Sequence, residues 1–193
     1  MKFEERKKQV LKKLEQGIDK SRKGSIDEPI KNLVWLINSL EYYYTTSSCS
    51  GRIMLQSSAL KGKKWENEWY FVSHDLIDDV DMIWNELNHD DVWLRMDAAI
   101  LHIACKSIED AEKMLIAARD AGFKRAGIIS LKNLIIEAIS TEHIEMPLVV
   151  DGKKLIDVNA LKIIIDEANK RLQRTHEKIK KFEMIIKERF LPL

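Results

Sequence analysis

The spacing of apolar residues along the chain predicts three helices. Apolar side chains recur every three or four positions over residues 2–18, again up to residue 40, and over residues 158–190, with lysine and glutamate between them. Ser25 and Glu28 lie three residues apart and resemble a capping box, so we expect the second helix to begin there. At about 1.5 Å per residue, the last helix would be roughly 50 Å long.

Shorter apolar runs in the middle of the chain predict strands at residues 68–74, 92–96, 98–105, 125–129 and 133–140. In the first of these strands, alternation places Trp69 and Phe71 on one face and Tyr70 and His74 on the other. The strands are predicted to be separated by helices at two points.

Capping residues mark where those two helices begin and end. We expect Asp78 or Asp79 to cap a short helix. Ser107, with Asp110 as its partner, opens a longer helix that ends at Gly122. A strand–helix–strand order over residues 98–129 is typical of a right-handed crossover within one sheet.

A polar stretch, residues 44–53, is predicted to be a loop between these apolar segments. Gly51 allows a left-handed backbone there, and Arg52 offers a rigid fork of donors suited to a carboxylate or phosphate. Successive small residues would also leave backbone N–H groups to face an anion. Composition alone leaves two interpretations open, an anion-binding loop and a plain serine-rich hairpin turn.

Together these elements predict one domain over residues 1–193 of the α/β (α+β) class, with a mixed sheet, flanking helices and a long C-terminal helix. The seven glycines form neither G-x-G-x-x-G nor a P-loop. The common nucleotide-binding folds are therefore disfavoured, and we expect a non-Rossmann fold.

Charge and cysteine content exclude several classes of protein. The chain has 32 basic and 31 acidic residues, so no global basic field indicates nucleic acid by itself, although residues 75–91 hold seven acids and no lysine or arginine. Two cysteines make neither a disulfide framework nor a zinc site, and no H-x-x-x-H or H-E-x-x-H spacing occurs, so no metal is expected. Without a signal-like start or an apolar run of about 18 residues, we expect a cytoplasmic protein with no membrane partner.

Few single residues carry obvious chemistry. His74 ends a predicted strand beside Asp75, a common place for a functional histidine. His102 lies within a predicted strand, where a satisfied sheet-face histidine is the more usual outcome. Cys49 could act as a nucleophile, but no base lies near it in the sequence.

The segment Thr46–Ile53, reading Thr-Ser-Ser-Cys-Ser-Gly-Arg-Ile, closely resembles the signature of the wybutosine-synthesis tRNA methyltransferases, which methylate the wyosine ring nitrogen. The likeness continues in order through the segments 69–75, 97–105, 121–128 and 140–148 and covers roughly residues 30 to 190. Two departures stand out. Ile139 precedes Ser140 where family members often have an arginine, and the glycine-rich approach to the tryptophan strand is reduced to Gly62–Trp65.

The resemblance implies S-adenosylmethionine-dependent methyl transfer to a ring nitrogen of a 4-demethylwyosine derivative beside the anticodon of phenylalanine tRNA. It also implies a non-Rossmann fold. Donor-binding residues would be Ser47, Ser50, Gly51 and Arg52, and catalytic groups would be Ser48, Cys49, His74 and Asp75. A covalent role for Cys49 is unnecessary, because His74 or Asp75 could accept a proton or hydrogen-bond the base.

If the substrate is a tRNA, as the resemblance implies, we can also predict which residues contact the RNA. Substrate contacts would come from Tyr44, Trp65, Trp69, His102, Ser140 and Glu145, with aromatic rings stacking on bases. Phosphates would meet Lys61, Lys63 and Lys64, with Lys170, Arg171 and Arg174 of the last helix as a second contact surface. The sequence leaves the oligomeric state open.

Two functions of other classes remain as alternatives. One is a non-catalytic RNA- or protein-binding α/β module that uses its basic C-terminal helix. The other, weaker, is a hydrolase with Cys49 as nucleophile. Binding of S-adenosylmethionine would separate the methyltransferase from the binding module.

Overall fold

The computed structural model describes residues 2–16, 25–57 and 68–191. The chain divides into two compact units, unit 1 (Met1–Ser50, Ala99–Thr141 and Thr175–Leu193) and unit 2 (Gly51–Ala98 and Glu142–Arg174). The chain passes between them within several of the motifs that carry the resemblance, first at the bond between Ser50 and Gly51. The prediction of one domain stays a prediction.

Unit 1 contains a four-stranded sheet in the order β1-β5-β7-β6, and every neighbouring pair is antiparallel. Its strands are β1 (Tyr43–Cys49), β5 (Ile100–Cys105), β7 (Ile135–Ile139) and β6 (Arg125–Ser130). Helix α4 (Ile108–Ala121) connects β5 to β6 in the same sheet, with β7 between them, as the strand–helix–strand order predicted. The hand of that crossover stays a prediction.

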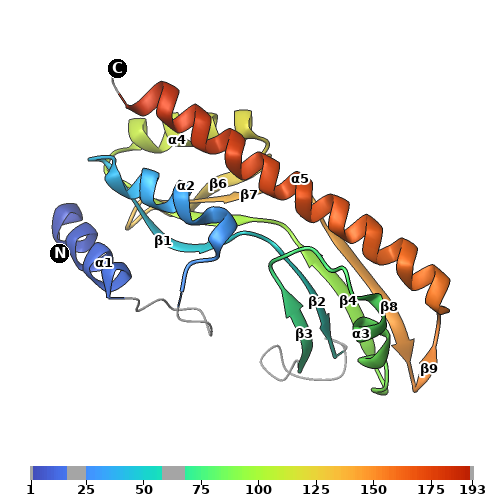
Figure 1. Ribbon diagram of the computed structural model, residues 1–193. Coiled ribbons are helices and arrows are strands. Elements are labelled where there is room, and N and C mark those ends of the chain that lie inside the picture. Colours follow the sequence, from blue (N-terminus) through green and yellow to red (C-terminus); the bar gives the residue numbers. More distant parts are fainter. Residues whose placement is uncertain (1, 17–24, 58–67, 192–193) are drawn as a thin grey trace. The chain divides into compact units, whose positions relative to one another are not determined.

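One face of this sheet carries the core of unit 1. Leu101 and Ile103 of β5 are buried against α2 (Glu28–Ser39), α4 and the C-terminal part of α5 (Val158–Phe190), which lie on the same side of the strands (Figure 1). Side chains alternate along a strand, so Tyr44 and His102 face the other way. There the ring of Tyr44 lies 5.2 Å from that of Phe3, on α1 (Phe3–Glu15), which covers part of this second face.

Unit 2 contains a five-stranded sheet in the order β3-β2-β4-β8-β9, again with antiparallel neighbours. Its strands are β2 (Arg52–Gln56), β3 (Trp69–Ser73), β4 (Val92–Asp97), β8 (Ile144–Val150) and β9 (Lys153–Lys154). Ile53, Leu55 and Leu94 are fully buried against α3 (Val80–Asn85) and the N-terminal part of α5. The strands and helices of both units confirm the predicted α+β class and the long C-terminal helix.

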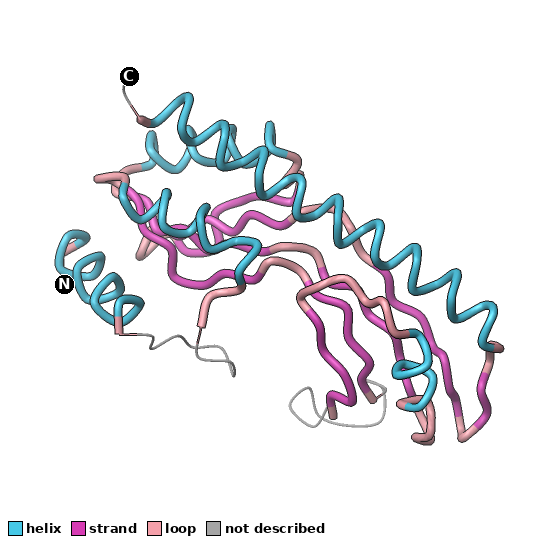
Figure 2. Tube along the Cα trace, in the orientation of Figure 1, coloured by secondary structure: helices cyan, strands magenta, loops and turns pink. Residues whose placement is uncertain are grey.

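The prediction of a loop over residues 44–53 is wrong. Residues 43–49 form β1, and Figure 2 shows them as a continuous strand. All of these residues except Thr46, which lies at a register shift, pair with β5, and the pairing uses backbone groups that a loop would have left for an anion. Only Ser50 and Gly51 separate β1 from β2, and Gly51 has φ 90°, the left-handed conformation that favours glycine.

Three of the predicted helix caps can be compared with the structure. The Ser25 capping box is wrong, because α2 begins after Asp27, whose carboxylate accepts a hydrogen bond from the Ser50 N–H at 2.9 Å. Asp79 caps α3 by accepting from the Met82 N–H. Ser107 and Asp110 form the predicted capping box of α4.

The predicted faces of β3 are wrong at Trp69 and at Tyr70, because Tyr70 packs against the core of unit 2 together with Phe71. Leu55 pairs with Phe71 and Gln56 pairs with Trp69, so Tyr70 is an extra residue in a bulge. Phe71 therefore packs on the core of unit 2, while Trp69 faces the opposite side with Gln56.

Among the described residues, no helix is long and apolar enough to cross a membrane.

Candidate functional site

A row of charged side chains crosses unit 2 on the sheet face opposite its core. Ile53 and Leu55 point into the core, so Arg52 of β2 points away from it. Asp97 lies directly opposite Arg52 on β4, and Glu145 of β8 lies opposite Arg95. Arg52, Asp97, Arg95 and Glu145 thus form a charged row over three neighbouring strands.

The side chains of the charged row are joined to one another by hydrogen bonds and ion pairs. Nε and Nη2 of Arg52 each lie 3.3 Å from Oδ2 of Asp97. Nη2 of Arg95 donates to Oδ1 of the same carboxylate at 3.1 Å, and Nε of Arg95 lies 3.8 Å from Oε1 of Glu145. Two guanidinium groups balance two carboxylates, and all four side chains are partly exposed, so the row can bind a ligand that carries charges of both signs.

Arg52 is also fixed by an aromatic ring. Its guanidinium carbon lies 4.8 Å from the centre of the Trp69 ring, a cation–π contact that is possible because the bulge turns Trp69 toward this face. The bonds to Asp97 use two of the five N–H groups of a guanidinium. Asp97 and Trp69 together orient the Arg52 guanidinium, and the bonds to Asp97 leave it with donors for an anion.

His74 follows β3 in the same unit. Its Nδ1 lies 2.9 Å from the carbonyl oxygen of Gly51. A carbonyl oxygen only accepts hydrogen bonds, so Nδ1 carries a hydrogen and the lone pair of the neutral ring is on Nε2. Asp75 is exposed, and its backbone N–H and carbonyl both bond to the Ser73 hydroxyl, at 3.1 and 2.8 Å.

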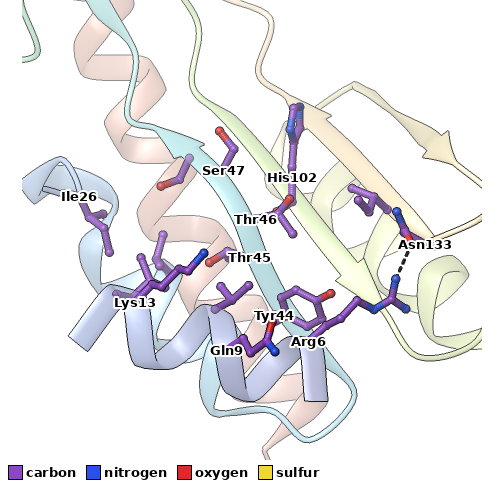
Figure 3. Close-up of a pocket in the computed structure, with 15 residues that line it drawn as sticks. Arg6, Gln9, Lys13, Ile26, Tyr44, Thr45, Thr46, Ser47, His102 and Asn133 are labelled. Carbon is purple, nitrogen blue, oxygen red and sulfur yellow. Dashed lines mark hydrogen bonds between the residues drawn. The ribbon is translucent and has the colours of Figure 1, made fainter. Parts of the chain in front are cut away.

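Unit 1 contains a pocket of about 610 Å³ between α1 and the second face of its sheet, which we call the α1 pocket (Figure 3). Its walls come from α1, α2 and Ile26 just before it, β1, β5, and residues 133–135 at the start of β7. The polar side chains that line it are Arg6, Gln9, Lys13, Tyr44, Thr45, Thr46, Ser47, Ser48, His102 and Asn133. The apolar ones are Val10, Leu14, Ile26, Val34 and Ile135.

Electrostatics distinguish the α1 pocket from the charged row. Arg6 and Lys13 line it, and among the described lining side chains none carries a carboxylate. Arg6 is held by a hydrogen bond from Nη1 to Oδ1 of Asn133. Burial raises the pKa of the Tyr44 hydroxyl, which therefore stays protonated. The pocket thus offers donors and positive charge to a ligand.

His102 enters the α1 pocket from the middle of β5. Nε2 of His102 lies 2.8 Å from Oε2 of Glu137, which is the cross-strand neighbour of His102 on β7. The two side chains are 28% and 31% exposed. Glu137 is not one of the lining residues. The pair fixes the orientation of the His102 ring at the wall of the pocket.

The structure groups the residues proposed from the sequence into two sets. Tyr44, Ser47, Ser48 and His102 line the α1 pocket. Arg52, Trp69 and Glu145 lie in or beside the charged row, in the same unit as His74 and Asp75.

The remaining proposed residues are more scattered. Ser50 and Ser140 are fully buried, and the Ser140 hydroxyl has no hydrogen-bond partner among the described residues. Cys49 is a partly exposed thiol that is not in a disulfide. Lys170 and Arg174 are exposed on α5, whereas Arg171 bonds to Glu167 at 3.0 Å. Trp65, Lys61, Lys63 and Lys64 lie outside the described residues.

Sequence reasoning gave no role to several residues that now appear at these places. Arg95 and Asp97 lie at alternate positions of a strand whose other positions are apolar, and charged residues at such positions were a usable signal. Arg6 and Lys13 had no such signal, because lysine and arginine recur along the whole polar face of α1. Asn133 lies in the turn before β7, where a polar residue is ordinary.

Comparisons with known proteins match nearly the whole chain. The family described as "Methyltransferase TYW3" matches residues 5–188. A protein of Thermococcus sibiricus named tRNA(Phe) 7-((3-amino-3-carboxypropyl)-4-demethylwyosine(37)-N(4))-methyltransferase is 36% identical over 186 residues, which are 94% of this chain and 92% of that protein. A Xenopus laevis tRNA wybutosine-synthesizing protein 3 homolog is 36% identical over 170 residues, 85% of this chain and 68% of that protein.

Solved structures agree with the sequence relatives. The structure of the PH1069 protein from Pyrococcus horikoshii has a TM-score of 0.86 and 35% sequence identity, and the match covers 95% of each chain. A hypothetical protein from Aeropyrum pernix has a TM-score of 0.74 and 28% identity, over 84% of this chain and 98% of that one. The fold described above is therefore shared over 95% of the first of these solved chains and 98% of the second.

Proposed function

Because the chain belongs to the methyltransferase TYW3 family, we propose that it methylates the N4 ring nitrogen of a 4-demethylwyosine derivative beside the anticodon of phenylalanine tRNA, with S-adenosylmethionine as donor. The observation that carries the proposal is the similarity over 94% and 92% of the chain to two relatives named for this reaction. The charged row and His74 support it.

The charged row suits the amino-acid end of the donor. That end carries an ammonium and a carboxylate, and the sulfonium lies close by. A carboxylate would meet the guanidinium of Arg52, while the cationic groups would lie near Asp97 and Glu145. This arrangement needs no glycine-rich turn, and the chain has none.

His74 suits the acceptor side of the reaction. The ring-nitrogen lone pair forms the new N–C bond, and the electrons of the broken S–C bond stay on sulfur. The nitrogen then loses its proton, which Nε2 of His74 accepts in our proposal, with Asp75 as the neighbouring alternative. In-line placement of donor and acceptor supplies a large part of the acceleration, and no covalent enzyme intermediate is needed.

The decisive test is the reaction itself. The protein is incubated with isotope-labelled S-adenosylmethionine and with tRNA from a strain that lacks this methylation, and the modified nucleoside is analysed by mass. We expect one added methyl group on the wyosine derivative. Binding of the tRNA with neither donor binding nor methyl transfer would instead support the alternative, a non-catalytic RNA-binding module.

Cys49→Ser is expected to retain most of the activity. Methyl transfer to a ring nitrogen requires no thiol nucleophile, and serine keeps a hydrogen-bonding group at the end of β1. The measurement is kcat/KM for tRNA, with the melting temperature recorded for both proteins. Complete loss of activity in a folded variant, together with a trapped methylated or base-linked Cys49 in the parent protein, would contradict this expectation.

A further inference from the structure

The α1 pocket has a charge that the proposed donor does not complement. Arg6 and Lys13 both line it, and the described lining side chains include no carboxylate. S-adenosylmethionine carries a sulfonium, an ammonium and one carboxylate, so it has one more positive than negative charge. Placing that molecule beside two cations is electrostatically unfavourable, because like charges at close range repel. The pocket therefore favours an anionic ligand.

The remaining lining residues favour a nucleotide among anions. Thr46, Ser47 and Ser48 bring hydroxyl groups from successive positions of β1, which can donate to and accept from a ribose. Val10, Leu14 and Ile135 provide apolar surface for a base. A volume of about 610 Å³ lies within the range of pockets that bind small ligands.

We propose that the α1 pocket holds one phosphate-bearing nucleotide of the RNA substrate, with Arg6 and Lys13 at its phosphate and the hydroxyls of β1 at its ribose. The nucleotide is one that neighbours the modified base and is not itself modified. This inference rests on the proposed function for the identity of the RNA. It makes α1 a binding element and not only a cover for the sheet.

Lys12 and Lys13 offer a matched pair for the test. They are neighbours in the last turn of α1 and both are exposed, but only Lys13 lines the pocket. Replacing either with glutamine removes one positive charge and keeps a good helix former. Any effect of overall charge or helix stability is therefore shared by the two variants. A difference in RNA affinity between them is then due to the place of Lys13 in the α1 pocket.

The measurement is the affinity for the anticodon stem–loop of phenylalanine tRNA across a salt series, with S-adenosylmethionine binding by calorimetry. For Lys13→Gln we expect the slope of log affinity against log salt to flatten by about 0.7–0.9, which is a loss of roughly four- to sixfold at about 0.15 M salt. For Lys12→Gln we expect less than a twofold change. Donor affinity is expected to stay the same in both variants.

Each other outcome overturns one statement. Equal losses in Lys12→Gln and Lys13→Gln would reduce the effect to surface charge and remove the pocket from RNA binding. A loss of donor affinity in Lys13→Gln alone would assign the pocket to the donor. A selective loss of RNA affinity in a protein that transfers no methyl group would keep the nucleotide site and refute the proposed function instead.

Discussion

Replacing Arg52 with alanine is expected to weaken the binding of S-adenosylmethionine by about 10- to 150-fold and to lower kcat/KM for the donor by a similar factor. The range corresponds to the roughly 1.5–3 kcal/mol that a hydrogen bond to a charged group contributes. Arg52 is oriented for this contact, because Asp97 holds one edge of the guanidinium and Trp69 lies against it. Calorimetry with the donor and steady-state kinetics measure the two quantities.

Two further variants make the result specific. Arg52→Lys keeps the charge but loses the planar fork, so it should recover only part of the affinity. Arg119→Ala removes an exposed arginine of α4 that bonds to the Ala126 carbonyl, and it should leave donor binding unchanged. Unaltered donor affinity in a folded Arg52→Ala protein would remove Arg52 from the donor site.

The balance of the charged row explains why arginine and not lysine is expected there. Asp97 accepts from both Arg52 and Arg95, so removing either guanidinium leaves a partly buried carboxylate with one partner fewer. An arginine can serve Asp97 with two N–H groups and still present others to a ligand. A lysine at position 52 has one nitrogen for both tasks.

Elements defined by local signals were predictable from the sequence. The last helix was expected over residues 158–190 and is observed as α5, Val158–Phe190. Ser107 and Gly122 were expected to begin and end a helix, and Gly122 has φ 105° at the end of α4. Caps and helical periodicity depend on residues within a few positions of one another, so a single sequence contains the information.

Strand β1 could not be identified in the same way. Its residues Thr45–Cys49 are hydroxyl- and thiol-bearing, and such residues are common in turns. They form a strand because β5, more than 50 residues later in the chain, supplies pairing partners such as Ile103 for Thr45. The bulge at Tyr70 was hidden for the same reason, because register depends on a neighbouring strand.

The candidate site shows the same difference between residues marked by local signals and residues brought together by distant pairing. Arg52 and His74 were singled out from the sequence, by a motif and by a position at a strand end. Their partners Asp97 and Gly51 emerge only from the pairing of β2 with β4 and from the turn that precedes β2. Lys13 was one of many lysines on a polar helix face, and only the packing of α1 on the sheet sets it apart from Lys12.

Replacing His74 is expected to have the second large effect on methyl transfer. The position of its ring allows two roles of the side chain to be separated. Its Nδ1–H donates to the Gly51 carbonyl, at the turn between β1 and β2. In the first role, the ring does nothing more than hold that turn in place. Alternatively, its Nε2 could act as the proton acceptor in the transfer. Asparagine places an N–H donor near the position of Nδ1 but has no basic nitrogen.

We expect His74→Asn to lower the single-turnover rate of methyl transfer by about 10²- to 10⁴-fold, the usual contribution of a general base, with little change in donor or RNA affinity. His89→Asn is the matched control, because His89 is an exposed histidine of unit 2 that stacks on Tyr70 at 3.8 Å and should leave the rate unchanged. If His74→Asn keeps the parent rate while His74→Ala loses it, His74 serves only to hold the Gly51 turn. The proton acceptor would then have to be another group, and Asp75 would be the first to test by the same measurement.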